Sequence, residues 1–261
     1  MSTLIVIPAR FASTRYPGKP LVELRGATGV AKSLIRRSWD AAMKVNGVDR
    51  VVVATDDDRI KEAAEAFGAE VVMTSESCRN GTERCADVIE RLDESYDIVA
   101  NLQGDAPLTP PWFVEKLVEG LAAAPEAHVA TPMLLCSKEA LASFKEDRKN
   151  DRVGGTTVVY DNKKRALYFS KEVIPFAPDL NVPVYHHVGV YAYRPASLRD
   201  YAALPEGFLE KQEGLEQLRF MENGLHVQCV EVENPGQEFW ELNNPEDVPR
   251  VEKILVQLGL E

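Results

Sequence analysis

The sequence contains no long apolar run, few cysteines and no excess of positive charge. No stretch approaches the roughly 18 apolar residues that a membrane-spanning helix needs, and no charged segment precedes an apolar run near the start, so we expect neither a membrane span nor a signal peptide. The formal net charge of −11 argues against a nucleic-acid-binding surface. The four cysteines form no C-x-x-C pair, which is typical of free thiols in the cytoplasm.

Two common phosphate-binding motifs are also absent, because neither G-x-x-x-x-G-K-[ST] nor G-x-G-x-x-G occurs. The chain instead has a cationic loop after residues 4–7, an apolar run that predicts a buried strand. The loop carries three cations and two hydroxyls, with no carboxylate before Glu23: Arg10, Arg15, Lys19, Ser13 and Thr14. An exposed loop with ordinary surface cations is one interpretation. Its place at the carboxyl end of a strand favours a polyphosphate site.

The first half of the chain alternates strand and helix patterns, which predicts an α/β fold with a mainly parallel, Rossmann-like sheet. We expect strands at residues 4–7, 49–54, 70–73, 97–102 and 129–135, with helices at 30–44, 60–67, 82–92 and 112–121. Cys85 lies on the apolar stripe of its helix and is predicted to be a core residue. Arg84 lies in the first turn, where a cation opposes the helix dipole, so it is either functional or an ordinary surface arginine.

Asp105 follows the fourth strand beside Gly104 and is well placed to hold Mg²⁺ against a triphosphate. The alternative is a turn aspartate that caps the next helix.

The second half changes character after a charged run at residues 145–152, which we interpret as a solvated connection. Short strands at 156–160 and 166–170 predict a hairpin, and a longer strand is expected at 185–194. His187 and Tyr191 share one face of that strand, as a ligand-facing wall or as structural residues. Further expected elements are a helix at 212–222, strands at 226–232 and 239–242, and a last helix that begins at Asn244 and Pro245.

Several motifs follow one another along nearly the whole chain. They are Ile-Pro-Ala-Arg at 7–10, Pro-Gly-Lys-Pro-Leu at 17–21, Ala-Thr-Asp-Asp at 54–57, Gly-Thr-Glu-Arg at 81–84, Asn-Leu-Gln-Gly-Asp at 101–105, Ala-Leu-Tyr-Phe-Ser at 166–170, His-Val-Gly-Val-Tyr at 187–191 and Leu-Glu-Gln-Leu-Arg at 215–219. Together they resemble the CMP-sugar synthetases, and most specifically the family of 3-deoxy-manno-octulosonate (KDO) cytidylyltransferases.

The resemblance implies the reaction of CTP with KDO to give CMP-KDO and pyrophosphate, with Mg²⁺, ahead of lipopolysaccharide or capsule assembly. It also implies a homodimer and a single nucleotidyltransferase domain over residues 1–261. Within that domain, residues 1–145 would form the nucleotide-binding part and residues 146–235 a mixed, partly antiparallel part for sugar-acid binding and dimerisation. Residues 236–261 would return to the nucleotide part.

The resemblance also implies roles for individual residues. The nucleotide-binding residues would be Pro8, Ala9, Arg10, Ser13, Lys19, Asn80, Gly81 and Gln103. The residues that line the sugar-acid pocket would be Arg84, Gln103, His187, Tyr191, Glu216 and Gln217. The metal ligands would be Asp105 and Asn243, and the catalytic residues would be Arg10, Lys19 and Asp105.

The chain departs from the family pattern at Ala106, Thr157, Lys171 and Asn243. Asn243 stands where the family has a second metal-binding aspartate, and Glu241 would either replace that carboxylate or be simply exposed to solvent. Two other functions therefore compete with KDO activation: activation of another α-keto sugar acid of the sialic-acid kind, and binding without catalysis. Retention of Arg10, Lys19, Gln103 and Asp105 favours an active enzyme.

Overall fold

The computed structural model describes residues 1–13, 16–153, 155–234, 242 and 244–261, and it divides into two compact units. Unit 1 comprises Met1–Glu115 and Pro235–Glu261, and unit 2 comprises Lys116–Asn234. The division at residue 145 that the resemblance implies is one of function, and it stays a prediction. Which substrate each part binds stays a prediction.

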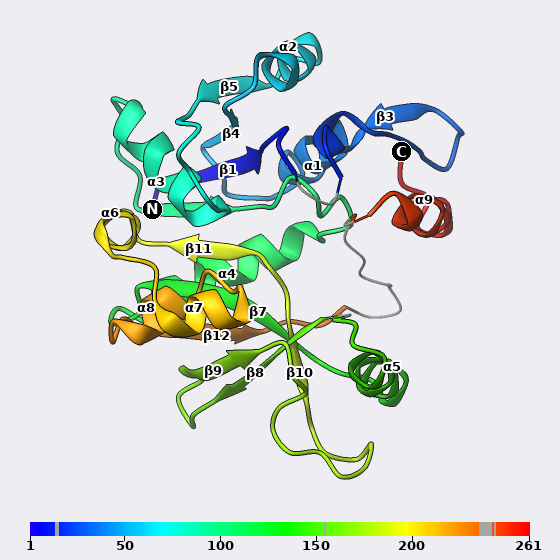
Figure 1. Cartoon of the computed structure of the whole chain (residues 1–261). Coiled ribbons are helices and arrows are strands. Elements are labelled where there is room, and N and C mark those ends of the chain that lie inside the picture. The colour runs from blue at the N-terminus through cyan, green and yellow to red at the C-terminus, as the bar shows by residue number, and fades with distance from the viewer. Residues whose placement is uncertain (14–15, 154, 235–241, 243) are drawn as a thin grey trace. The chain divides into compact units, whose positions relative to one another are not determined.

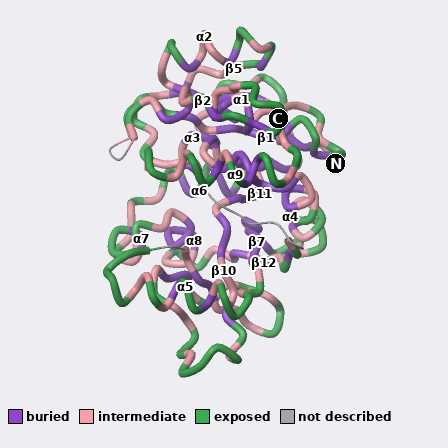
Figure 2. Tube along the Cα trace, turned by 90° about the vertical axis from the view of Figure 1, so that its right-hand side faces the viewer, coloured by how far each residue is buried: buried purple, intermediate pink, exposed green. Residues whose placement is uncertain are grey.

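Unit 1 is built on a parallel sheet (Figure 1). Its described strands lie in the order β5 (Glu70–Met73), β4 (Arg50–Thr55), β1 (Thr3–Ala9) and β6 (Ile98–Asn101), and every neighbouring pair is parallel. The apolar run at residues 4–7 lies in β1 and has no exposed surface, and Figure 2 shows this part of the trace as buried. The predicted mainly parallel α/β sheet is confirmed.

The helices of unit 1 follow the strands along the chain. They are α1 (Leu34–Ala42), α2 (Asp58–Ala66), α3 (Gly81–Arg91) and α9 (Val248–Gln257), with single turns η1 (Lys19–Leu21) and η2 (Pro245–Asp247). Helix α4 (Pro111–Ala123) begins in unit 1 and continues into unit 2. Cys85 in α3 has no exposed surface, which confirms it as a core residue.

The predicted helix at 30–44 was wrong at its start. Ala31–Ser33 form strand β3, which pairs antiparallel with β2 (Glu23–Arg25). The backbone pairing satisfies N–H and C=O groups of residues 31–33 outside the helix, and Leu34 N–H bonds to Val22 O at 2.8 Å. The apolar spacing of Leu34 and Ile35 could not reveal this pairing, because it depends on a partner strand elsewhere in the chain.

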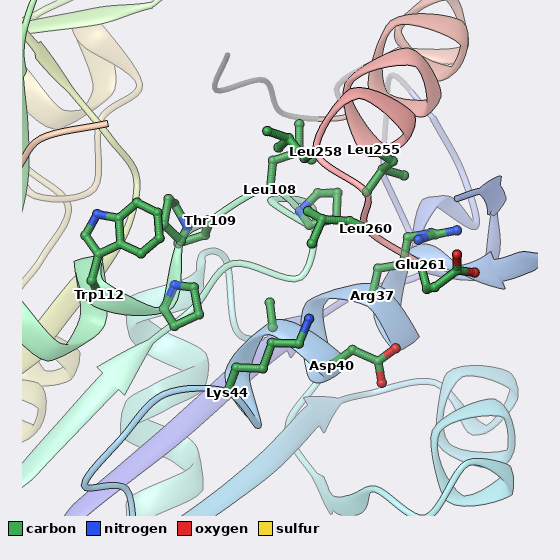
Figure 3. Close-up of a pocket in the computed structure, with 14 residues that line it drawn as sticks. Arg37, Asp40, Lys44, Leu108, Thr109, Trp112, Leu255, Leu258, Leu260 and Glu261 are labelled. Carbon is green, nitrogen blue, oxygen red and sulfur yellow. The ribbon is translucent and has the colours of Figure 1, made fainter. Parts of the chain in front are cut away.

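Helix α9 packs onto an apolar cluster that includes Leu24, Leu34, Leu108 and Leu242. The chain enters the helix through η2, where Asn244 N–H bonds to the Asp247 carboxylate at 2.7 Å, so the predicted start of this segment is confirmed. Figure 3 shows a pocket beside α9. It is lined by α1, by the segment 107–112 and by the leucines of α9 and the residues after it, and it includes none of the predicted site residues.

Unit 2 contains a mixed sheet around β7 (Val129–Leu135). Strand β12 (Val227–Glu231) pairs parallel with β7, whereas β11 (Tyr191–Tyr193) and β10 (Tyr185–His187) pair antiparallel with it. Strand β10 also pairs with β8 (Thr156–Tyr160), which forms a hairpin with β9 (Ala166–Ser170). The predicted hairpin at 156–170 is confirmed, and the mixed, partly antiparallel region agrees with the predicted fold class.

The predicted strand at 185–194 is broken in two. Residues 188–190 leave the ladder in a tight turn, in which Val190 N–H bonds to Val188 O at 2.8 Å. The alternating apolar pattern continues through this turn, so the sequence did not show the break. His187 and Tyr191 still lie on one side of it, with ring centroids 5.7 Å apart.

Two helix assignments in unit 2 were also wrong. The predicted helix at 212–222 is divided into α7 (Phe208–Glu213) and α8 (Leu218–Glu222), because Gly214 adopts a left-handed conformation with φ 62° that ends α7. The charged run at 145–152 is not a connection over most of its length: residues up to Lys149 belong to α5 (Lys138–Lys149). Helix α6 (Pro195–Ala203) follows β11.

Among the described residues, no helix is both long enough and apolar enough to cross a membrane.

Candidate active site

The predicted nucleotide-binding residues of unit 1 lie at the end of β1, in the loops after β1 and β6, and at the start of α3. Arg10 follows β1 directly and is exposed, and Gln103 follows β6. Because parallel strands end at the same edge of the sheet, their loops meet there, and this edge is where open α/β sheets bind ligands.

Two glycines let the backbones at this edge approach closely. A Cβ atom on Gly104 would lie 2.6 Å from the carbonyl oxygen of Pro8. A Cβ atom on Gly81 would lie 2.8 Å from Asn101 Nδ2 and 3.4 Å from Gln103 Nε2. The structure therefore brings Pro8, Gly81 and Gln103 close together. Only glycine fits at position 104, and a side chain at position 81 would require Asn101 to shift.

Asn80 has a structural function that the sequence analysis missed. It is the N-cap of α3, and its side-chain oxygen accepts a hydrogen bond from Glu83 N–H at 2.8 Å. Arg10 donates a hydrogen bond to Arg79 O at 3.4 Å, so the cationic loop lies beside the start of this helix. Helix N-termini favour anions, and the Asn-Gly-Thr-Glu sequence could have identified the cap.

Ser13 and Lys19 belong to the same loop but differ in their contacts. The Ser13 hydroxyl accepts a hydrogen bond from Tyr16 N–H at 3.4 Å. Gly18 precedes Lys19 with φ 70°, a left-handed conformation that suits glycine. The Lys19 side chain is 11% exposed, and its Nζ lies 2.6 Å from Oδ2 of Asp105. Thr14 and Arg15 lie outside the described residues.

This ion pair joins the predicted triphosphate lysine to the predicted metal ligand. The Asp105 carboxylate is 28% exposed, so it is within reach of solvent. Its backbone carbonyl accepts a hydrogen bond from Leu242 N–H at 3.1 Å. Asn243 and Glu241 lie outside the described residues, so their predicted roles stay predictions.

Among the described residues, no cluster of three or more histidine, cysteine or acidic side chains could hold a metal by itself. A single carboxylate nevertheless suits Mg²⁺, which is commonly bound by one or two carboxylates together with substrate phosphates and water. The donor set at Asp105 therefore fits a metal that arrives with a triphosphate.

Arg84 is buried, in contrast to the surface-arginine interpretation. It is 2% exposed, and its guanidinium bonds to the Asp56 carboxylate at 2.9 Å and to the Thr74 hydroxyl. Its predicted contact with the sugar acid is untested. The sequence pattern does not reveal the Asp56 partner, which lies 28 residues away, directly after β4.

In unit 2, three of the predicted sugar-binding residues contact one another. Tyr191 donates a hydrogen bond to Oε1 of Gln217 at 3.1 Å, and Nε2 of Gln217 lies 3.5 Å from Nδ1 of His187. All three residues are buried. Glu216, the neighbour of Gln217, is half-buried in the break between α7 and α8.

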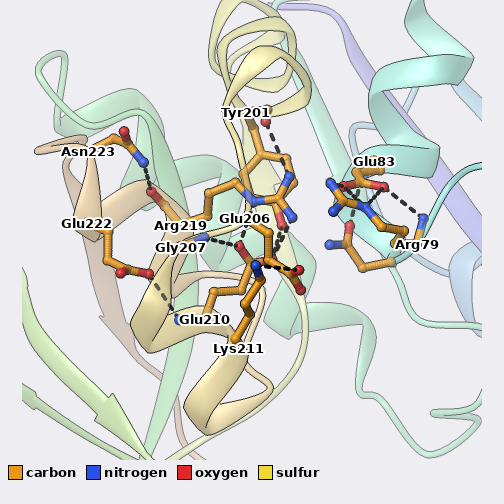
Figure 4. A network of polar contacts seen from close by, with 11 residues as sticks. Arg79, Glu83, Tyr201, Glu206, Gly207, Glu210, Lys211, Arg219, Glu222 and Asn223 are labelled. Atoms are coloured by element: carbon orange, nitrogen blue, oxygen red, sulfur yellow. Dashed lines mark hydrogen bonds and ion pairs between the residues drawn. The ribbon is translucent and has the colours of Figure 1, made fainter.

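A buried ion pair stabilises the break between α7 and α8. The sequence analysis did not predict this ion pair. Arg219 has no exposed surface and forms a two-pronged contact with Glu210, at 2.7 and 2.6 Å (Figure 4). The Tyr201 hydroxyl also bonds to Glu210, at 3.2 Å, and the Arg219 guanidinium lies over the Tyr201 ring. The pair joins α7 to α8 and so holds the intervening Gln217 in place.

The four cysteines are free thiols, as predicted. Burial raises the pKa of Cys136 to about 11 and that of Cys229 to about 12, so neither is a thiolate nucleophile at neutral pH.

Burial, with a smaller effect of His186, lowers the pKa of His187 to about 3, and burial, with a smaller effect of Arg148, lowers the pKa of His186 to about 4. Below about pH 6.5 these histidines are protonated in the unfolded chain but stay neutral in the folded chain, so the free energy of unfolding decreases as the pH falls. We expect the free energy of unfolding to fall by about 2 kcal/mol per histidine between pH 7 and pH 5.

Urea denaturation at the two pH values measures this loss. Over the same pH interval, the free energy of unfolding of the His186→Gln variant should fall by about 2 kcal/mol less than that of the unsubstituted protein, because one of the two histidines is absent. Equal unfolding free energies at pH 7 and pH 5 in the unsubstituted protein would contradict the prediction.

The family model for cytidylyltransferases matches residues 4–232. The chain is 47% identical to the 3-deoxy-manno-octulosonate cytidylyltransferase of Maricaulis maris over 261 residues, which covers 99% of both chains. It is 40% identical to the enzyme of the same name from Zea mays over 254 residues, or 96% of this chain and 80% of that relative. Among solved structures, it is similar to a CMP:2-keto-3-deoxy-manno-octonic acid synthetase in complex with CTP, with a TM-score of 0.85, 36% identity and coverage of 99% and 100%.

Proposed function

The chain belongs to the cytidylyltransferase family, and we propose that it transfers the cytidylyl group of CTP to KDO or a close analogue. The full-length identity of 47% to a 3-deoxy-manno-octulosonate cytidylyltransferase is the observation that carries this proposal. The products are the CMP-sugar and pyrophosphate. The CMP-sugar would supply lipopolysaccharide or capsule assembly.

In this reaction the anomeric hydroxyl of the sugar acid attacks the α-phosphorus of CTP, and the bond to pyrophosphate breaks in line. Such transfers are accelerated mainly by positioning and by neutralisation of charge, and they need no protein nucleophile. Arg10 and Lys19 lie in the loop after β1 and neutralise the triphosphate. Pro8, Gly81 and Gln103, whose atoms crowd together, form a close-fitting surface for the nucleoside.

Mg²⁺ is the proposed cofactor, with Asp105 as its principal protein ligand. The metal would supply positive charge at the triphosphate. Support comes from the partly exposed Asp105 carboxylate and from the position of its loop at the ligand-binding edge of the sheet. The ammonium group of Lys19 bonds to that carboxylate at 2.6 Å, so we expect it to move from Asp105 to a phosphate oxygen when CTP binds.

For the sugar acid, we propose contacts from His187, Tyr191, Glu216 and Gln217 of unit 2. The support in unit 2 is a set of polar side chains that the buried Arg219–Glu210 pair holds in place.

The experiment that tests this function is pyrophosphate release from CTP with a panel of sugar acids. KDO and its 8-amino analogue should support release, whereas N-acetylneuraminate should not. Pyrophosphate release with N-acetylneuraminate alone would identify the substrate as a sugar acid of the sialic-acid class. Binding of CTP without release from any sugar acid would favour a non-catalytic relative.

We also propose a cytoplasmic homodimer. Free thiols are typical of the cytoplasm. Leu167 lies on β9 at the end of the sheet order and is 59% exposed, and Phe176 is 87% exposed. Exposed apolar side chains beside an edge strand are typical of an interface.

Sedimentation equilibrium should give twice the chain mass of 29.0 kDa. The double variant Leu167→Asp/Phe176→Asp should weaken association at least tenfold, because each change puts a charge into the proposed contact. The matched control is Val256→Asp, at an apolar position on α9 that is 54% exposed. A purely monomeric wild-type protein would contradict the proposed homodimer. Equal weakening of association by the control variant would show that Leu167 and Phe176 do not form the interface.

A further inference from the structure

The hydroxyl of Thr131 in β7 is hydrogen-bonded to one nitrogen of the His187 ring. Its hydroxyl oxygen lies 2.8 Å from Nε2 of His187, and both residues are buried. The same oxygen lies 2.9 Å from the carbonyl oxygen of Val190 and 3.4 Å from that of Val188. One hydroxyl therefore faces two carbonyls, in the turn between β10 and β11, and one imidazole nitrogen.

The hydroxyl carries a single hydrogen, and a carbonyl oxygen can only accept. The carbonyl oxygen of Val188 already accepts a hydrogen bond from Val190 N–H at 2.8 Å. A buried carbonyl is costly to leave without a donor, so the hydroxyl hydrogen goes to the carbonyl of Val190, which lies 2.9 Å away. Nε2 of His187 must then carry the ring proton and donate it to Thr131. Because burial and the adjacent His186 keep the pKa of His187 near 3, the ring is neutral at pH 7, and Nδ1 has a free lone pair.

The other side of the ring agrees with this tautomer. The Tyr191 hydroxyl donates to Oε1 of Gln217, which turns the amide nitrogen of Gln217 towards Nδ1 of His187. That contact is 3.5 Å long, whereas the contact to Thr131 is 2.8 Å. Nδ1 is therefore the ring nitrogen whose partner a ligand can most easily replace.

We propose that Thr131 is a positioning residue that fixes His187 as the Nε2–H tautomer, so that Nδ1 accepts a hydrogen bond from a hydroxyl of the sugar acid. The second part of the inference rests on the proposed function, and the first part does not. His187 would then recognise a sugar hydroxyl and not the sugar carboxylate, because a neutral lone pair attracts a donor and repels an anion.

Nitrogen NMR of the ¹⁵N-histidine-labelled protein tests the tautomer without any substrate, with His187→Gln to assign the signal. The wild-type protein should show protonated Nε2 and unprotonated Nδ1 at pH 7. Thr131→Val should shift the ring towards the Nδ1–H form, and Thr131→Ser should restore the wild-type signal. The matched control is Thr157→Val, which removes another buried hydroxyl that donates to a carbonyl, that of Glu172, and should leave the His187 signal unchanged.

Kinetics then test the link to the sugar. Thr131→Val should raise the KM for KDO about tenfold, equivalent to one lost hydrogen bond, while the KM for CTP changes less than twofold. An equal rise in both KM values would overturn the positioning role.

The outcomes separate this inference from the proposed function. A wild-type Nδ1–H signal, or an unchanged signal in Thr131→Val, would overturn the tautomer assignment even if KDO is a substrate. No pyrophosphate release with KDO in the wild-type protein would overturn the proposed function and the sugar contact, and would leave the tautomer result standing. If Thr131→Val fails to fold, the wild-type and Thr131→Ser spectra decide the assignment.

Discussion

Replacement of Lys19 by methionine should lower kcat/KM for CTP by roughly 10²-fold or more, which is the usual effect of losing one preorganised charge contact in an active site. The side chain is only 11% exposed, and a left-handed Gly18 and the short turn η1 hold its backbone. The ammonium group is therefore positioned before CTP binds. Methionine has a similar length and keeps the packing of the aliphatic chain, so the decrease in kcat/KM measures the contribution of the positive charge.

Steady-state pyrophosphate release measures this effect. The control is Lys61→Met, which removes a lysine on α2 that is 39% exposed and contacts Glu65 only at 4.0 Å. The control should keep kcat/KM within twofold. Lys19→Arg should recover only part of the activity, because a planar guanidinium cannot reproduce the geometry of the 2.6 Å contact with Asp105. Unchanged kinetics in Lys19→Met would show that this loop is not part of the active site.

The parallel sheet and the place of the phosphate loop were predictable because both depend on local patterns. Residues 4–7 form a short apolar run that can only be buried, and β1 lies between two parallel neighbours. The polar residues after each strand then gather at one edge by geometry alone. The same reasoning placed Lys19 and Asp105 in one site, although they are 86 residues apart.

The missed features depend on partners that are distant in the sequence or on backbone conformation. Arg84 appeared unfavourable in the first turn of α3 because its partner, Asp56, lies in the loop after β4, 28 residues away in the sequence. The helical pattern over residues 212–222 concealed the left-handed turn at Gly214. The bond between Thr131 and His187 joins β7 to β10, and no spacing rule connects those two positions.

Asp105→Asn should nearly abolish turnover, by roughly 10³-fold or more, while the protein stays folded. A metal at the triphosphate contributes several kcal/mol of transition-state stabilisation, and the substitution removes the only charged ligand proposed among the described residues. The fold should survive because the carboxylate is partly exposed and the backbone bond from Leu242 N–H to Asp105 O remains. Circular dichroism and a thermal melt check the fold.

Titration with Mg²⁺ then separates the metal from the ion pair. In Asp105→Asn, the Mg²⁺ concentration for half-maximal rate should rise at least tenfold, whereas the affinity for CTP without metal should stay level or improve, because Lys19 no longer bonds to a carboxylate. Asn243→Asp should lower the half-maximal Mg²⁺ concentration if a second carboxylate strengthens the site, and Glu241→Gln should raise it only if Glu241 supplies that carboxylate. Unchanged Mg²⁺ dependence and full activity in Asp105→Asn would exclude Asp105 as the metal ligand and leave it as the partner that orients Lys19.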